Sequence, residues 1–225
     1  VMDSDRSKAV RSEVLGRVRA ALGERPATPE DIRAEAAALL PAGDVMQPKF
    51  EGQTSRARFI EKATSERLTA TVDEVPDMAG AVAAVRAYIE RSNLPMRIAL
   101  PPMPALSELD WGNIETHQAI APNEPIAVGL ADYAIAETGT LVFTSRAESP
   151  TLSNYLPLHH VILVEASKIL RYMEDYWADV RANGNVHPRN TNFITGTSGT
   201  ADIEAKNVRG AHGPRFMHVV IVGTD

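Results

Sequence analysis

The sequence contains no cysteine among its 225 residues. This absence excludes disulfides, thiolate-bound zinc, cysteine nucleophiles and iron–sulfur clusters held by the chain's own thiolates. If the protein takes part in electron transfer, a partner must therefore carry the redox centre. The six histidines show no metal-ligand spacing such as HExxH. We expect neither a metal site nor a cofactor bound directly to this chain.

Long apolar runs are also missing. No stretch approaches the roughly 18 apolar residues of a membrane span, and the start, VMDSDRSKAVRSEV, lacks the apolar core of a secretory signal peptide. The net charge of −6, from 23 basic and 29 acidic residues, argues against a general nucleic-acid-binding surface. We therefore expect a cytoplasmic protein that neither spans a membrane nor binds nucleic acid.

The first 50 residues predict a helical appendage. The apolar spacing favours one helix over residues 3–22, and Thr28 with Asp31 has the pattern of a capped second helix. Two prolines and a glycine make residues 41–48 a predicted linker. The appendage is expected either to contact a partner or to pack on its own domain.

Residues 51–225 predict a single α/β domain, because helical and strand patterns alternate as in an open sheet of parallel strands. The expected segments, in chain order, are a helix over 54–68, a strand over 69–75, a helix capped by Asp77, a strand over 97–101, an apolar segment over 125–130, strands over 133–136, 140–144 and 160–164, a helix over 167–181, a strand over 192–195, a short helix after it, and a strand over 217–222.

The turn between the strands at 133–136 and 140–144 carries chemistry-bearing side chains. Glu137 can act as a base or nucleophile or can hold a ligand hydroxyl, which makes it the candidate catalytic residue. Gly139 permits a positive φ and a close approach of a ligand, and Thr138 and Thr140 supply hydroxyls. A plain hairpin, with the Glu137 carboxylate solvated or bonded to turn amides, is the alternative.

A second Gly/Ser/Thr segment follows the strand that ends at Thr195. Free amides at a helix start, with hydroxyls beside them, suit a phosphate or a carboxylate. The segment is neither a Walker A loop nor a GxGxxG fingerprint, and a simple capped turn explains it equally well. Its acidic residues would oppose an anion unless they cap the helix or bind a metal or a hydroxyl. The candidate ligand-binding residues are Thr195, Gly196, Ser198, Thr200, Asp202 and Glu204.

The third candidate is the turn that precedes the last strand, where Arg209, His212, Gly213 and Arg215 suit a carboxylate or phosphate. We expect the three turns to meet in one polar pocket outside the carboxyl ends of the strands, where ligands collect in open α/β sheets.

Two other residues in the second half of the sequence are not expected to be functional. Ser153 lacks the G-x-S-x-G elbow of a serine hydrolase. His160 leads into an apolar strand and is expected to be a hydrogen-bonded core histidine.

The ordered set GLADYAIAETGTLVF, LPLHHVILV and ITGTSGTADIEAKNVRGAHGPRFMHVVIV, spread over residues 126–223, resembles the LUD-domain family. This resemblance implies a Rossmann-like α/β fold similar to the ribose-phosphate isomerase and CoA-transferase superfamily. It also implies a role in oxidising lactate to pyruvate. The helical start and the lack of cysteine resemble the family's stand-alone C-type proteins, whose implied partners are the iron–sulfur proteins A and B.

One departure from the family pattern affects the second turn. The family commonly reads Thr-Gly-Pro-Ser-Arg/Lys-Thr-Ala-Asp, whereas this chain has Thr197 and Gly199. The missing basic side chain at 199 removes an anion contact, which Arg209 or Arg215 is hypothesised to replace. Two alternatives stay open: a stand-alone CoA-transferase-like or ligase-like enzyme using Glu137, and a module that binds a small carboxylate or phosphate.

Overall fold

The structure is a computed structural model that describes residues 4–23, 28–39, 47–201 and 207–224. It separates into two compact units, Val1–Gln47 and Pro48–Asp225, which are treated one at a time.

The first unit contains two helices, α1 (Ser4–Leu22) and α2 (Pro29–Leu39), in the two places where the sequence predicts them. The predicted cap is present: the Thr28 N–H donates to the Asp31 carboxylate at 2.8 Å, and the Asp31 N–H donates to the Thr28 hydroxyl at 3.1 Å. The predicted linker lies mostly outside the described residues. No helix in the described ranges is long and apolar enough to cross a membrane.

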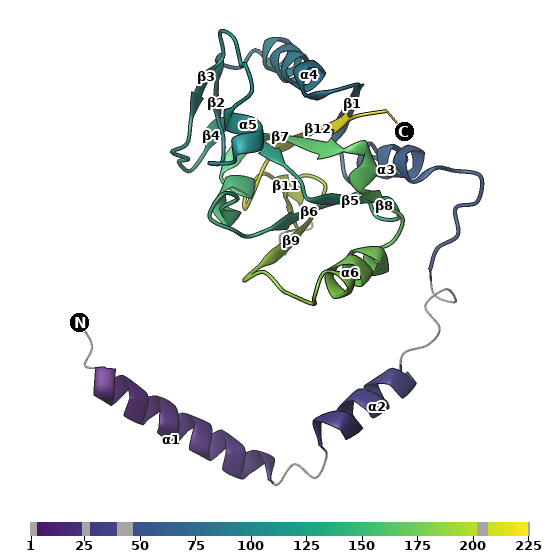
Figure 1. Cartoon of the computed structure of the whole chain (residues 1–225). Coiled ribbons are helices and arrows are strands. Elements are labelled where there is room, and N and C mark those ends of the chain that lie inside the picture. The colour runs from purple at the N-terminus through teal and green to yellow at the C-terminus, as the bar shows by residue number, and fades with distance from the viewer. Residues whose placement is uncertain (1–3, 24–27, 40–46, 202–206, 225) are drawn as a thin grey trace. The chain divides into compact units, whose positions relative to one another are not determined.

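The second unit is built on a six-stranded sheet in which every neighbouring pair is parallel (Figure 1). The strand order is β1-β12-β7-β4-β2-β3. The strands are β1 (Thr71–Val75), β2 (Arg97–Ala99), β3 (Glu115–His117), β4 (Glu124–Leu130), β7 (Pro157–Glu165) and β12 (Phe216–Val222). This sheet confirms the α/β class.

The central strand β7 is apolar on both faces because both faces of the sheet are covered, as parallel sheets require. Val161 and Leu163 pack against the helix side, while Ile162 and Val164 belong to the core on the opposite side. All four side chains have no exposed surface. The short continuous apolar run in the sequence therefore corresponds to a strand buried between two layers.

Helices α4 (Met78–Arg91) and α5 (Pro104–Ser107) contribute to the core on one face of the sheet. The predicted cap of α4 forms, since the Asp77 carboxylate accepts the Gly80 N–H at 2.8 Å. Ala81, Val85 and Ile89 on its inner face are fully buried.

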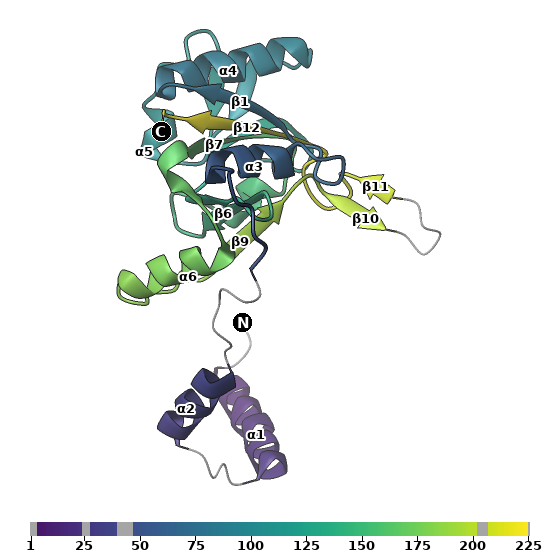
Figure 2. The same ribbon diagram turned by 90° about the vertical axis from the view of Figure 1, so that its right-hand side faces the viewer.

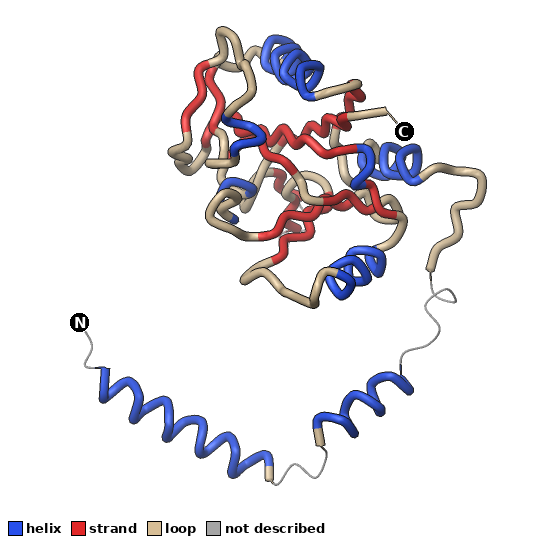
Figure 3. Tube along the Cα trace, viewed as in Figure 1, coloured by secondary structure: helices blue, strands red, loops and turns tan. Residues whose placement is uncertain are grey.

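A second sheet, of order β8-β5-β6-β9, covers the other face together with α3 (Ser55–Ala63) (Figure 3). Its strands are β5 (Tyr133–Ile135), β6 (Thr140–Thr144), β8 (Ile169–Leu170) and β9 (Thr191–Thr195). Helix α6 (Met173–Ala182) packs on the outer face of this sheet. The sequence predicts three of these strands but not that they form a separate sheet.

Three predicted helices differ from the structure. The helix expected over 167–181 is a short 3-10 turn (Ala166–Lys168), then β8, and α6 begins only at Met173, because Ile169 and Leu170 pair with β5. The helix expected over 54–68 ends at Ala63. The short helix expected after Thr195 is instead β10 (Gly199–Ala201), paired antiparallel with β11 (Asn207–Arg209) in an arm that projects from the body (Figure 2).

We predict that the double-sided burial of β7 dominates stability. Leu163→Ala should lower the free energy of unfolding by about 2–5 kcal/mol, because it opens a cavity in the core. Leu152→Ala, in the 3-10 turn Thr151–Asn154 where Leu152 is 62% exposed, should change it by no more than about 0.5 kcal/mol. Urea denaturation of both variants measures the difference, and equal effects would contradict the assignment of β7 to the core.

Candidate functional site

The loop between α3 and β1 is the point where the predicted turns meet. The Thr197 N–H donates to the Leu68 carbonyl at 3.1 Å, and the Thr69 and Thr197 hydroxyls lie 2.9 Å apart. Gly196 has φ +76°, and a Cβ there would lie 2.8 Å from the Leu68 Cα. The second turn therefore needs glycine at 196 in order to lie against Leu68.

The first turn joins the second through a row of hydroxyls. The Thr138 and Thr140 hydroxyl oxygens are 2.7 Å apart, and the Thr140 and Thr195 oxygens are also 2.7 Å apart. The antiparallel register of β6 and β9 sets Thr140 opposite Thr195. Gly139, at φ +71°, would bring a Cβ within 2.9 Å of the Leu68 side chain. Both glycines thus pack on the same leucine.

The third turn is bound to the second by main-chain hydrogen bonds. The Ser198 N–H donates to the Pro214 carbonyl at 2.9 Å, and the Gly210 N–H donates to the Ser198 carbonyl at 3.0 Å. Gly213 also lies against Ser198, because a Cβ at 213 would be 3.2 Å from the Ser198 Cβ. The three turns therefore lie side by side, as predicted.

Four predicted site residues lie apart from these contacts or cannot be placed. His212 is exposed on the third turn, and Thr200 belongs to strand β10. Asp202 and Glu204 fall outside the described residues.

The predicted location of the site was wrong in one respect. Thr69 comes just before β1, and Arg215, whose N–H donates to the Leu158 carbonyl at 2.9 Å, comes just before β12. Because the strands are parallel, the second and third turns lie at the amino edge of the six-stranded sheet and not at its carboxyl edge. The general rule for ligands in open α/β sheets does not locate these turns.

The turns line two cavities instead of one pocket. We call the first the threonine pocket; it has a volume of about 660 Å³ and includes Lys62, Leu68, Glu137, Thr138 and Thr195. The second, the arginine pocket, has a volume of about 700 Å³ and is lined by Thr69, Val208, Arg209, Arg215 and Phe216.

In the threonine pocket, Glu137 has a structural partner. One carboxylate oxygen accepts the Met173 N–H at 2.9 Å, and Met173 is the first residue of α6. A carboxylate at this position accepts a hydrogen bond from an amide that has no partner within the helix. Its negative charge also interacts favourably with the positive end of the helix dipole. The bonded alternative for Glu137 is therefore observed, although its partner is a helix amide and not a turn amide. Lys62 and Arg67 also line this pocket, and so does Glu61, so its basic side chains are balanced in number by Glu61 and Glu137.

In the arginine pocket, two guanidinium groups are available. Arg209 donates to the Thr69 hydroxyl and, at 3.4 Å, to the Thr197 hydroxyl. The Arg215 guanidinium lies 5.5 Å from the centre of the Phe216 ring. Both arginines are exposed, and neither forms an ion pair with any carboxylate of the described residues. The hypothesis that they replace the missing basic residue at 199 is consistent with this geometry.

Sequence reasoning missed a polar cluster beside this pocket. The Tyr88 hydroxyl lies 2.9 Å from Nδ1 of His159, and the Tyr88 ring stacks on His218 at 4.6 Å. The Arg91 guanidinium lies 5.0 Å above the Tyr88 ring. Burial lowers the pKa of His218 to about 4, lowers the pKa of His159, and raises that of Tyr88. The residues come from α4, β7 and β12, so no local pattern connects them.

His160 belongs to the core, as predicted, but the prediction that it is hydrogen-bonded was wrong for Nδ1. That atom is buried and has no hydrogen-bond partner among the described residues. Burial lowers the pKa of His160 to about 3, so the ring is neutral at ordinary pH. It stacks on Phe143, with ring centres 5.9 Å apart.

Among the residues that the structure describes, no group of three or more His, Asp or Glu side chains is arranged to hold a metal ion.

These features define an α/β domain with cationic and hydroxylated recesses at one edge. A solved structure described as a DUF162 family protein from Deinococcus radiodurans has a similar fold, with a TM-score of 0.57 and 19% identity over 75% of this chain and 96% of that one. Residues 123–222 match the model of the LUD domain, so this part of the chain is similar in sequence to that family.

Relatives with a similar sequence include two proteins named lactate utilization protein C. That of Geobacillus thermodenitrificans is 34% identical over 117 residues, which cover 50% of this chain and 49% of the relative. That of Exiguobacterium sp. is 32% identical over 127 residues, or 53% of this chain and 55% of the relative. The chain thus spans about half the length of the relatives it matches.

Gly196 provides a test of the contact with Leu68. Gly196→Ala should destabilise the protein by more than about 2 kcal/mol, because a strained φ is combined with an overlap on the Leu68 main chain. Gly184→Ala is the matched control: φ is +87°, but the nearest atom to a new Cβ is 4.0 Å away, so about 1 kcal/mol of strain is expected. Equal losses in thermal or urea unfolding would show that the contact does not constrain the turn.

Glu137 provides a second test. Glu137→Ala should lower the free energy of unfolding by about 1–2 kcal/mol through loss of the helix cap, and Glu137→Gln, which keeps an acceptor, by about half as much. Glu148→Ala, at an exposed carboxylate 4.0 Å from Arg146, should have almost no effect. Unchanged stability of Glu137→Ala would instead indicate a carboxylate that is free to act on a ligand.

Proposed function

We propose that this chain acts in lactate utilization, as a cytoplasmic, non-redox component of a set of proteins that oxidises lactate to pyruvate. The observation that carries the proposal is the similarity of about half of the chain to proteins named lactate utilization protein C, together with the match of residues 123–222 to the LUD domain model. That similarity covers about half of each relative. The activity of the full-length relatives is therefore assigned to this chain only as part of the proposal.

The composition of the chain supports the proposal that partner proteins carry out the electron transfer. Lactate oxidation releases two electrons, and this chain has no thiolate with which to hold an iron–sulfur cluster. In this proposal the iron–sulfur proteins A and B accept the electrons. The chain would contribute a surface for them, a site for a small carboxylate or phosphate, or both.

The threonine pocket supports the second of these contributions. It is lined by the hydroxyls of Thr138 and Thr195 and by Lys62 and Arg67, which can bind a carboxylate or phosphate where they are not engaged by Glu61. A CoA-transferase-like catalyst that uses Glu137 is a weaker proposal, because one oxygen of that carboxylate accepts a hydrogen bond from the first residue of α6. Membership of the related superfamily also stays a proposal.

Growth on lactate tests this proposal. Deleting the gene should abolish growth on lactate as sole carbon source and leave growth on pyruvate unchanged, because only the oxidation step is lost. Restoring the wild-type chain should recover growth on lactate. Normal growth of the deletion strain on lactate would contradict a role in lactate utilization, and oxidation of lactate by the purified chain alone would contradict its non-redox role.

A further inference from the structure

A third cavity adjoins the arginine pocket. It has a volume of about 390 Å³ and is lined in part by Tyr88, Arg91 and His159; we call it the tyrosine pocket. Thr69 and Phe216 line both cavities, so the two are neighbours along the amino edge of the sheet. Together they form a single region, which we call the edge recess.

The edge recess contains a stack of aromatic rings that is open to solvent. Phe216 is 45% exposed, and the His159 ring stacks on it with centres 4.4 Å apart and planes 22° apart. The edge of Tyr88 meets the same histidine at 5.9 Å. Exposed aromatic surface at a cavity wall is favourable for stacking a planar ligand ring.

The edge recess also has positive charge that the described residues do not neutralise. Arg91 is paired with Asp73 at 3.2 Å, but Arg209 and Arg215 have no such carboxylate among the described residues. Guanidinium groups match the geometry of phosphate oxygens and bind them in a bidentate manner. Two arginines without a carboxylate partner among the described residues, on a chain with a net charge of −6, indicate a local attraction for anions.

His159 adds a hydrogen-bonding group between the rings and the charges. Its Nδ1 lies at hydrogen-bond distance from the Tyr88 hydroxyl, while no described residue bonds its Nε2. With Nδ1 accepting from the tyrosine, Nε2 carries the proton and can donate to a ligand.

We propose that the edge recess binds a ligand that joins a planar ring to a phosphate, of the nucleotide class. The ring lies against the Phe216–His159 stack, and the phosphate lies between Arg209 and Arg215. The cavities of about 700 and 390 Å³ are in the size range of ligand sites and are much larger than a small acid such as lactate needs. This site is separate from the threonine pocket and does not depend on the role in lactate utilization.

Calorimetric titration of the purified full chain tests the proposal, with adenosine 5′-monophosphate, adenosine and inorganic phosphate as probes. The monophosphate should bind about tenfold or more tightly than either fragment, since it makes both contacts. Arg215→Gln and Phe216→Leu should each weaken its binding by about fivefold or more, whereas Phe216→Tyr should retain it. Arg181→Gln, an equal loss of charge at an exposed position on α6, should leave binding unchanged.

Three results would overturn the proposal. If the monophosphate does not bind detectably, the edge recess is not a ligand site of this class. Equal weakening by Arg181→Gln and Arg215→Gln would reduce it to general charge attraction. Phosphate binding as tightly as the monophosphate would exclude recognition of the ring. Circular dichroism of each variant verifies its fold, and if Arg215→Gln is misfolded, Arg209→Gln provides the same comparison.

Discussion

The hydrogen bonds that follow strand β9 hold the candidate sites together. Beyond Thr195 the chain leaves the antiparallel sheet and is bonded first to the Leu68 carbonyl, through Thr197, and then to the Pro214 carbonyl, through Ser198. These two bonds connect the second sheet to the amino edge of the parallel sheet. The three turns and both pockets around them depend on that connection.

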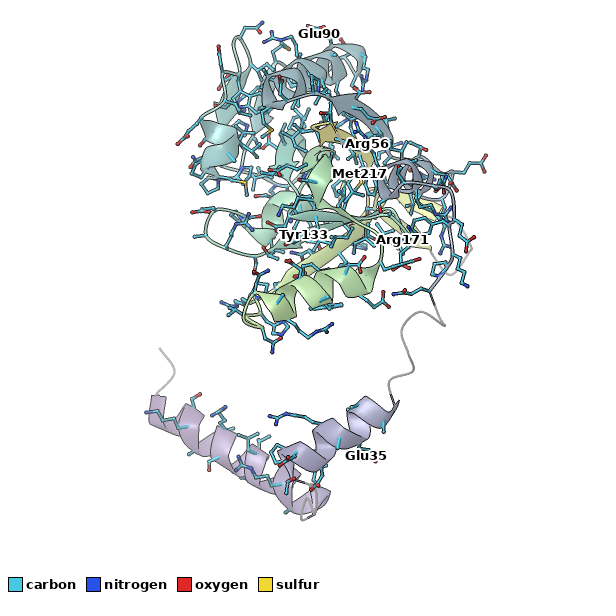
Figure 4. All side chains as sticks on the ribbon, turned by 45° about the vertical axis from the view of Figure 1, so that its right-hand side comes forward. Glu35, Arg56, Glu90, Tyr133, Arg171 and Met217 are labelled. Atoms are coloured by element: carbon cyan, nitrogen blue, oxygen red, sulfur yellow. The ribbon has the colours of Figure 1, made fainter. Side chains whose placement is uncertain are left out.

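This connection explains why polar and charged groups gather at one edge of an otherwise apolar sheet. The strands β7 and β12 are buried on both faces, and Met217 of β12, labelled in Figure 4, is one of their buried side chains. The polar residues His159 and Arg215 lie near the points where these strands begin. The hydroxyls of Thr138 and Thr195 line the pocket beside Leu68, whereas Arg209, Arg215 and the Phe216 ring line the pocket beside Thr69. The two pockets therefore have different chemistry although the residues that separate them are adjacent.

The sequence predicts those parts of the fold that have a local signal. The apolar runs of β7 and β12 and the caps at Thr28 and Asp77 were located correctly, because burial and capping act over a few residues. Strand β10 was predicted as a helix, since three small residues have no periodicity and only the partner strand β11 defines them.

The residues of the candidate site were likewise predicted only where they have a local signal in the sequence. The turns at 137–140 and 209–215 were found because glycine and polar residues mark turns. The pair of Tyr88 and His159 was not found, because 71 residues separate its members and only the packing of α4 brings them together. The edge of the sheet was also predicted incorrectly, because a general rule about ligands was applied although the turn at 209–215 precedes its strand and therefore lies at the amino end of that strand.

Native-state hydrogen exchange tests the central connection most directly. If the links after β9 form one unit, the amides of Thr197, Ser198 and Gly210 should all be protected and should open with similar free energies. Protection of Thr197 together with rapid exchange of Ser198 and Gly210, at the rate of unbonded amides, would contradict the account. In that case the third turn would move independently of the other two.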